Sequence, residues 1–229
     1  MSIKRSKRYK ENKENISKIK TASINDAIKA FKGNKTVKFD ETLDISVMLN
    51  KEKNKGEGLS RGFAQLPNGT GKQIKVAVFA IGEKAKEAKE AGADIVGNED
   101  LIKEIKDGKI NFDVAVSTPE MMKNIAVIGE KLGPLGIMPN PKTGTVTDNI
   151  TKTIKNIKGG QIQFRSEKNA IVQAGIGKIS FTEENLISNF KEFIVAVNKS
   201  KPDTIKGKFI NKVYLSTSMG PSIKIENIK

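Results

Sequence analysis

The middle of the chain alternates between short apolar runs and longer charged segments with helical spacing. The apolar runs are residues 74–80 (IKVAVFA), 94–97 (DIVG) and 112–117 (FDVAVS). Such runs, each followed by a helical pattern, are typical of parallel strands that are buried on both faces. The pattern therefore predicts repeated βα units, in which helices cover a small, open parallel sheet.

Residues with strong conformational preferences mark the helix ends in this region. Gly92 and Gly108 stand where a helix is capped at its C-terminus, and Glu99 with Asp100 opens the helix that ends before Gly108. Pro119 suits the first turn of a further helix.

The two ends of the chain follow a different pattern. Before residue 67 come a basic arm, a helix around residues 23–31 and one long strand over residues 35–50, whose alternate apolar positions share one side. These positions are Val37, Phe39, Leu43, Ile45, Val47 and Leu49. After residue 158, the patterns predict strands at 160–166, 170–176, 208–218 and 222–226, and a helix over 183–198.

Neither end carries enough elements to fold alone. The economical arrangement pairs residues 1–66 with residues 159–229 in one discontinuous α+β domain. The βα block, residues 67–158, is then inserted into that domain. The sequence thus predicts an α/β protein of two domains.

Composition excludes several classes of enzyme. The 229-residue chain has no cysteine and no histidine, which rules out disulfides, Ser-His-Asp triads and the usual zinc ligand sets. A basic protein without clustered acids is also a poor setting for carboxylate, lysine or Mg²⁺ chemistry. We therefore expect no catalytic residue, no metal and no cofactor. No apolar run approaches the roughly 20 residues that cross a bilayer, and the basic start lacks the apolar stretch of a secretory signal, so we expect a soluble, intracellular protein.

Positive charge is concentrated in the two ends. The chain holds 41 Lys and Arg against 26 Asp and Glu, a net charge of +15. Residues 1–66 contribute +8 and residues 159–229 contribute +5, whereas residues 67–158 contribute only +2. Neutralisation of phosphates with release of counterions is the main source of nucleic-acid affinity, so this segregation favours a polyanion bound by both ends. A lysine-rich surface that only keeps the protein soluble is the alternative.

Residues 132–147 (LGPLGIMPNPKTGTVT) are dense in residues that break regular structure. They include Pro134, Pro139, Pro141, Gly133, Gly136 and Gly144. The prolines fix φ and remove backbone donors, and the glycines permit conformations closed to other residues. We expect a stiff, shaped loop here and neither a helix nor a central strand. Such a loop is either functional or a rigid return linker.

Residues 67–73 (PNGTGKQ) match a phosphate-binding loop poorly. A Walker loop needs glycine where Leu66 stands and Ser or Thr where Gln73 stands, and it should precede a helix, whereas a strand is expected here. Residues 174–180 (AGIGKIS) also match a phosphate-binding loop poorly, because they lack the first glycine and continue as a strand. A domain-entry turn is the simpler interpretation of the first segment. A small nucleotide-binding protein or enzyme that uses Lys72 of this GTGK loop is the alternative function.

Residues 216–222 (STSMGPS) lie between two predicted strands, where Gly220 and Pro221 would form a turn in any protein. The segment also suits RNA, because Gly220 lets a sugar-phosphate chain approach closely and Met219 can pack on a ribose or base. The hydroxyls that can bond phosphate or 2′-OH groups belong to Ser216, Thr217 and Ser218. Aromatic residues make up only 5% of the chain, which favours reading of folded RNA by shape over a stacking platform.

Many segments together resemble one family, that of the large-subunit ribosomal protein conventionally numbered one. The matching motifs span nearly the whole chain: KRYKE at the start, KFDET at 38–42, RGFAQLPNGTGK at 61–72, VAVFA, AGAD, GPLGIMPNPKTGTVT, QFRSEK at 163–168, IGKISF and SMGPS. The resemblance implies a first domain built from both chain ends, an inserted Rossmann-like second domain, and no enzymatic activity.

The resemblance also implies partners. It predicts a cytoplasmic component of the large ribosomal subunit that binds rRNA, forms the mobile stalk near the tRNA exit site and assists release of deacylated tRNA. It further predicts repression of its own operon through an mRNA site that imitates the rRNA. No membrane contact and no obligate homo-oligomer are expected.

Site residues follow from the resemblance where motifs match. RNA binding is implied for Lys38, Phe39, Thr42, Asp44, Arg165, Lys168, Ser218, Met219 and Gly220. By alternation, Phe39 suits the core as well as an RNA-binding face. Asp44 and Ser218 stand where the family usually has Glu and Thr, which preserves the chemistry. Leu135 replaces a common Arg and removes a charge from that loop.

Overall fold

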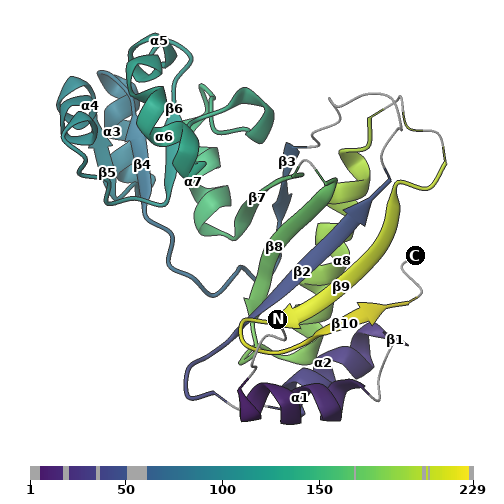
Figure 1. Ribbon diagram of the computed structural model, residues 1–229. Coiled ribbons are helices and arrows are strands. Elements are labelled where there is room, and N and C mark those ends of the chain that lie inside the picture. The colour runs from purple at the N-terminus through teal and green to yellow at the C-terminus, as the bar shows by residue number, and fades with distance from the viewer. Residues whose placement is uncertain are drawn as a thin grey trace. The chain divides into compact units, whose positions relative to one another are not determined.

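The structure, a computed structural model, describes residues 6–17, 21–34, 37–50, 61–167, 169–202, 205 and 207–226. The chain forms two compact units (Figure 1). The first unit combines Met1–Gly71 with Ile162–Lys229, and the second is Lys72–Gln161. Both boundaries between the units therefore lie a few residues later in the chain than the domain boundaries that the sequence predicted.

The first unit contains a five-stranded sheet that interleaves both ends of the chain. Its order is β1 (Thr21–Ala22), β10 (Ser222–Ile225), β9 (Ile210–Thr217), β2 (Thr42–Leu49) and β8 (Ile171–Lys178). β1 pairs with β10 in parallel, and the other pairs are antiparallel. A strand from before the second unit thus lies between two strands from after it (Figure 1).

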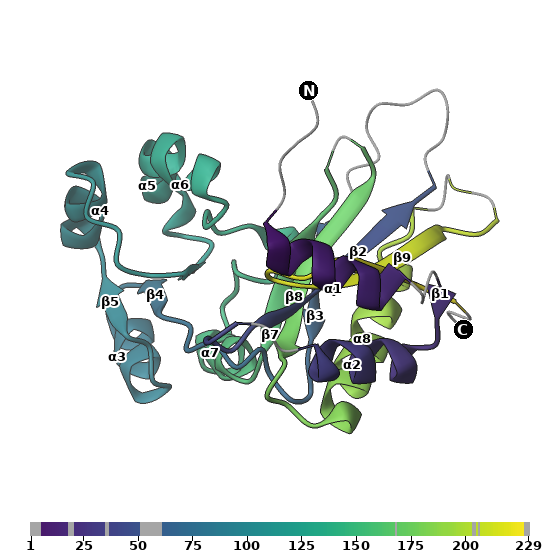
Figure 2. The same cartoon turned by 60° about the horizontal axis from the view of Figure 1, so that its bottom comes forward.

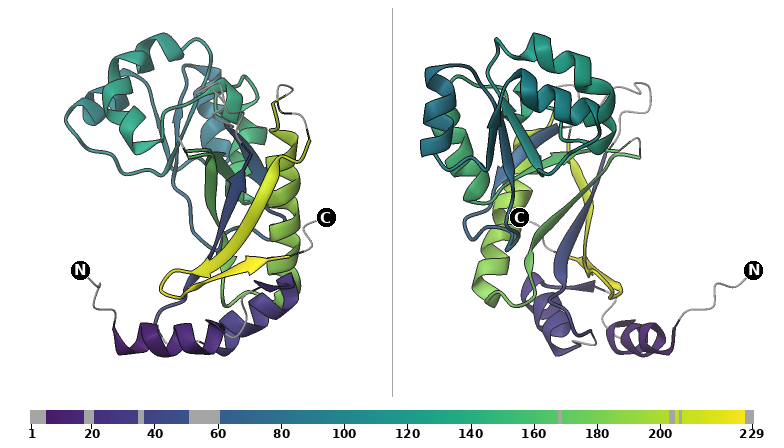
Figure 3. Two further views of the ribbon diagram at one scale, coloured as in Figure 1. Left: turned by 45° about the vertical axis from the view of Figure 1, so that its right-hand side comes forward. Right: turned by 90° about the vertical axis from the view of Figure 1, so that its left-hand side faces the viewer.

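Helix α8 runs along one face of this sheet (Figure 3). α2 (Ile24–Gly33) and α8 (Glu183–Lys199) begin after Ser23 and Thr182, whose side chains each accept a backbone N–H of the first turn. Both helices pack into one core with the alternate apolar residues of β2. α1 (Lys7–Ser17) lies at the same end of the sheet as α2 (Figure 1). These contacts explain why the two ends of the chain form a single core.

A separate two-stranded sheet joins β3 (Arg61–Gln65) to β7 (Gln161–Arg165). Phe164 of β7 meets Phe193 of α8 edge to face, with ring centroids 5.6 Å apart. This geometry is favoured between aromatic rings, and it ties the small sheet to the core of the first unit.

The second unit is a three-stranded parallel sheet with helices on both faces. The strand order is β5 (Ile95–Gly97), β4 (Val76–Phe79) and β6 (Val114–Ser117), and both pairs are parallel. Because side chains of β4 alternate, Val76 and Val78 pack into one core and Ala77 and Phe79 into another. The predicted parallel pairing is confirmed. The central strand β4 is buried on both faces as expected, whereas β5 is only partly buried.

Different helices cover the two faces of this sheet. α3 (Glu83–Glu90) and α7 (Ile150–Lys158) contribute to the core of Val76 and Val78. The other core receives α4 (Glu99–Lys106), α5 (Met122–Ile125), η1 (Ala126–Ile128) and α6 (Gly129–Leu135). The expected glycine caps are confirmed, since Gly92 and Gly108 follow α3 and α4 with φ of 91° and 87°. Pro119, however, lies in a turn before α5 and not inside its first turn.

The long strand expected over residues 35–50 is shorter in the structure. β2 begins at Thr42, and residues 37–39 form a bend before it. Leu43, Ile45, Val47 and Leu49 are buried as the alternation predicts, but Phe39 lies outside the strand and is 52% exposed. The alternation therefore holds only for the hydrogen-bonded part of the segment.

The expected loop over residues 132–147 begins later than predicted. α6 continues through Pro134 to Leu135 and ends at Gly136, which has φ of 73°. Pro134 cannot donate the helical hydrogen bond of its position, but Gly133, which precedes it, has no Cβ to clash with the proline ring. Beyond Gly136 the segment is irregular apart from η2 (Pro141–Thr143), as predicted. Hydrogen bonds between Asn140 and Thr145 hold its shape.

Candidate nucleic-acid interface

Most of the expected site residues meet where β2 begins beside the turn between β9 and β10. We call Thr42, Asp44, Ser216, Ser218, Met219 and Gly220 the turn cluster. Asp44 pairs with Ser216 across the β2–β9 ladder. The backbone N–H of Thr42 donates to Ser218 Oγ at 3.1 Å, and the N–H of Ser218 donates to the Thr42 carbonyl at 3.2 Å. Two segments that are 176 residues apart in the sequence are thus held in direct contact.

Glu41 fixes the turn from below the surface. Its carboxylate accepts the backbone N–H of Met219 at 2.9 Å, and only 6% of the residue is exposed. Its carbonyl accepts the N–H of Ile179 at 2.9 Å. Sequence reasoning missed Glu41 as a functional residue, although it stands inside the KFDET motif.

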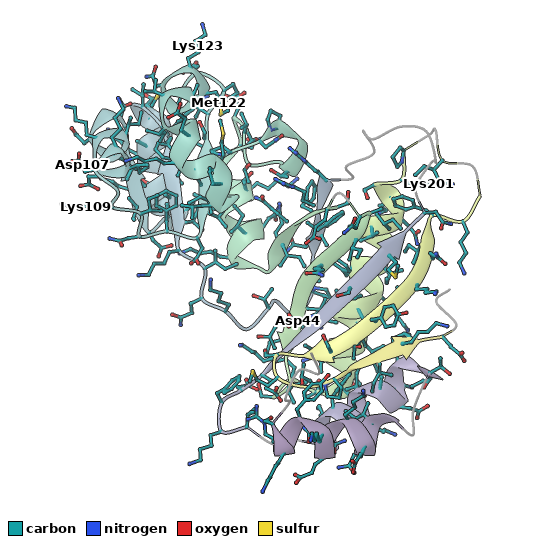
Figure 4. The ribbon with its side chains drawn as sticks, in the orientation of Figure 1. Asp44, Asp107, Lys109, Met122, Lys123 and Lys201 are labelled. Carbon is teal, nitrogen blue, oxygen red and sulfur yellow. The ribbon has the colours of Figure 1, made fainter. Side chains whose placement is uncertain are left out.

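Lys178 of β8 adds a cation to the turn cluster. Its Nζ donates to Thr42 Oγ1 at 2.9 Å and to the carbonyl of Asp40 at 3.4 Å. Asp44, labelled in Figure 4, lies on the same face of the sheet. Burial raises the pKa of the Asp44 carboxyl, and the positive charge of Lys178 opposes that rise. Lys178 was also missed, because nothing in a strand pattern shows which residue of β8 reaches β2.

The tight turn depends on Gly220. A Cβ added at this position would stand 2.3 Å from Thr217 Oγ1, which is far too close, and the N–H of Gly220 donates to the Thr217 carbonyl at 3.2 Å. Thr217 itself is buried, with 7% exposed, whereas Met219 is 46% exposed. The turn therefore presents Ser218 and Met219 to solvent and keeps Thr217 inside.

Other expected residues lie elsewhere. Arg165 is exposed at the end of β7, next to Ser166, which bridges to Val172. Since Val172 and Lys178 stand at opposite ends of β8, roughly 20 Å of strand separate Arg165 from the turn cluster. Lys38 is exposed in the bend before β2. Lys168 lies outside the described residues.

The charge distribution favours the first unit as the one that binds a polyanion. Its two segments hold 27 Lys and Arg against 14 Asp and Glu, whereas the second unit holds 14 against 12. Three ion pairs join side chains in the described part of the chain, and all three lie in the second unit. The excess positive charge and the turn cluster therefore belong to the same unit.

The GTGK loop has a structural role in the second unit. Lys72 Nζ donates to Asp113 Oδ1 at 2.6 Å, and Asp113 Oδ2 accepts the backbone N–H of Lys75 at 3.1 Å. These two hydrogen bonds, with that from Lys72 the stronger influence, lower the pKa of Asp113. The ammonium group that a phosphate would need is thus committed to a carboxylate, and a strand follows the loop in place of a helix.

Within the described residues, no three acidic, histidine or cysteine side chains gather where they could hold a metal ion. No helix there is long and apolar enough to cross a membrane.

The chain is similar to known proteins over almost its whole length. Residues 28–221 match the model of the Ribosomal protein L1p/L10e family. A relative, the large ribosomal subunit protein uL1 of Bifidobacterium adolescentis, is 46% identical over 224 residues, which cover 98% of this chain and 97% of the relative.

Proposed function

The chain belongs to the Ribosomal protein L1p/L10e family, and from that premise we propose that it binds large-subunit rRNA directly through the turn cluster of its first unit. It is a ribosomal protein and not an enzyme. Its relative of 46% identity is a large-subunit protein, so we assign this chain to the large subunit of the cytoplasmic ribosome.

One observation carries the proposal for the binding face. Thr42 and Ser218 are joined by one hydrogen bond between their backbones and one from the Thr42 N–H to Ser218 Oγ, on the unit that carries most of the excess positive charge. This contact sets the Ser218 hydroxyl, the exposed Met219 side chain and the Lys178 ammonium at one end of a sheet. Hydroxyls and ammonium groups bond phosphate and 2′-OH groups, and a thioether packs on a ribose. Arg165 and Lys38 would add charge at the edges of the contact.

Three finer roles are part of the proposal. The protein forms the mobile stalk of the large subunit near the tRNA exit site, contacts the departing tRNA and assists its release. It also represses its own operon by binding an mRNA site that imitates the rRNA. The positive charge of the first unit supports all three, because each partner is an RNA.

Binding to large-subunit rRNA tests the proposal. The full chain should protect one region of that rRNA in a footprint, with an affinity that falls steeply as salt rises. Ser218→Tyr should weaken binding about tenfold or more, because the ring would occupy the space where the backbone of the RNA approaches. The variant also removes the Oγ acceptor of the Thr42 N–H, so its melting temperature is measured alongside and binding is compared at a temperature where it is fully folded.

Val127→Tyr is the matched control, because Val127 is 62% exposed on the second unit. It should bind as the wild type does. Equal losses of rRNA affinity in Ser218→Tyr and Val127→Tyr, or a footprint that neither substitution changes, would refute the turn cluster as the binding face.

A further inference from the structure

An open hollow adjoins the turn cluster on the first unit. It is lined by Ser6, Arg8, Tyr9 and Met219 and has a volume of about 390 Å³. Figures 1 and 2 show the start of α1 beside the turn between β9 and β10, which is where these residues come from. Ligand pockets in proteins range from about 300 to 1,000 Å³, so the hollow has room for one nucleotide.

The side chains around the hollow have the chemistry that an unpaired nucleotide needs. Tyr9, one of only two tyrosines in the chain, supplies an aromatic ring, and Met219 supplies an exposed thioether. Any of the four bases can stack on an aromatic side chain, because every base has a π-face. The hollow is therefore lined by a ring and a thioether that can hold a base, and by the guanidinium group of Arg8.

Arg8 gives a second, independent observation. Its Nε is buried and makes no hydrogen bond to the part of the chain that the structure describes. A buried donor without an acceptor costs free energy, so the Arg8 side chain would gain by turning its guanidinium group toward a phosphate or base oxygen placed in the hollow that it lines. Lys7 and Lys10 are exposed on the same helix and keep the surroundings positive.

We infer that this hollow binds one unpaired nucleotide of the RNA, with the base against Tyr9 and Met219 and an acceptor oxygen on Arg8. The inference rests on the proposed function, because Met219 belongs both to the turn cluster and to the hollow. The nucleotide would thus be continuous with the RNA on the turn cluster. A peptide is a poorer occupant, since a cation beside an aromatic ring on a strongly basic unit favours a stacked, phosphorylated ligand.

Fluorescence of 2-aminopurine, placed in turn at each unpaired position of the protected rRNA fragment, tests this with the full chain. One position should change its emission on binding to the wild-type protein. Tyr9→Phe should keep the signal, because it keeps the ring. Tyr9→Leu should abolish the signal and weaken binding on the order of tenfold.

Arg8→Ala should also lose affinity, and by more than Lys10→Ala, which removes one charge from the same helix outside the hollow. Circular dichroism of each variant checks that α1 is retained. Binding of RNA by the wild type, with no position that responds or with Tyr9→Leu and Arg8→Ala equal to their controls, would overturn the inference and leave the proposed function standing. Absence of rRNA binding by the wild type would instead refute the proposed function.

Discussion

At the scale of single residues, Glu41 is the clearest case of a buried group that shapes an exposed one. Its carboxylate accepts the N–H of Met219 and so sets the turn that presents Ser218. Glu41→Gln retains an oxygen that can accept this bond, whereas Glu41→Ala leaves the N–H without its acceptor.

We expect Glu41→Ala to lower the free energy of unfolding by about 1–3 kcal/mol, the usual cost of a buried polar group that loses its partner. Glu41→Gln should lose less. Urea denaturation measures both, and rRNA affinity should follow the same order. Equal stability of the two variants would show that the bond to Met219 does not hold the turn.

Asp44 carries a second prediction at this scale, because burial raises the pKa of its carboxyl in the folded state. A folded pKa above the unfolded one favours the protonated form. The associated stability is present below the unfolded pKa, near 3.9, and is lost as pH rises through the folded value. At neutral pH, the ionised Asp44 therefore slightly destabilises the folded state.

Asp44→Asn should raise the melting temperature at pH 7 by about 1–2 °C, a small shift for a chain of this size. The gain should disappear near pH 3.5, where the wild-type carboxyl is protonated. A gain that is independent of pH would mean that the charge of Asp44 is not its cause.

At the scale of elements, two carboxylates hold the beginning of β4. Asp94 accepts the N–H of Val76 at 2.9 Å and pairs with Lys158 at 3.2 Å, and Asp113 accepts the N–H of Lys75. The hydrogen bond from Val76, more than Lys158, lowers the pKa of Asp94. A lowered folded pKa gives stability that is present above the unfolded pKa and is lost as pH falls through the folded value.

Asp94→Asn should therefore reduce stability at pH 7 by about 1 kcal/mol or less and should flatten the fall in melting temperature below pH 4. Asp148→Asn is the control, because Asp148 joins an ion pair with Lys84 while 70% of its own side chain is exposed. The melting temperature of Asp148→Asn should match that of the wild type at pH 7 and below pH 4. An acid profile unchanged by Asp94→Asn would contradict the assignment.

The elements differ in how far their sequences could predict them. β2 and α8 were predictable because their apolar residues recur with the period of a strand or helix and face one core. β4 was predictable because its continuous apolar run fits a strand that is buried on both faces, between two cores. The sequence of α1 predicts only a basic arm, because KRYKENKENIS buries only Asn12 and Ile16 among its described side chains and so shows no apolar face. α7 was missed although Ile150, Ile154 and Ile157 give a helical period, which was a readable signal.

The candidate site was less predictable than the elements. Pattern alone placed the Ser-rich turn and suggested RNA, but the approach of Ser218 to Thr42 depends on β2 lying beside β9, which no local pattern encodes. The resemblance to a family supplied that link. Glu41 and Lys178 escaped because their roles are contacts with other strands.

At the scale of the whole molecule, the segregation of charge predicts where affinity for RNA lies. A shortened chain that joins residues 1–71 to 162–229 through a flexible Gly-Ser linker should fold, because these segments share one core. It should keep most of the rRNA affinity and its steep salt dependence. Binding that follows residues 72–161 instead, measured on that segment alone, would contradict the assignment.

The place of β2 between β8 and β9 also dictates an order of events during synthesis. Its neighbours β8 and β9 are translated after the second unit, so β2 leaves the ribosome before either strand is available to pair with it. The second unit is contiguous and can fold as soon as it emerges, whereas the first must wait for almost the last residue. A prematurely terminated chain would therefore yield a folded insert that lacks the assembled turn cluster, so under our proposal only a completed polypeptide can take its place in a nascent ribosomal particle.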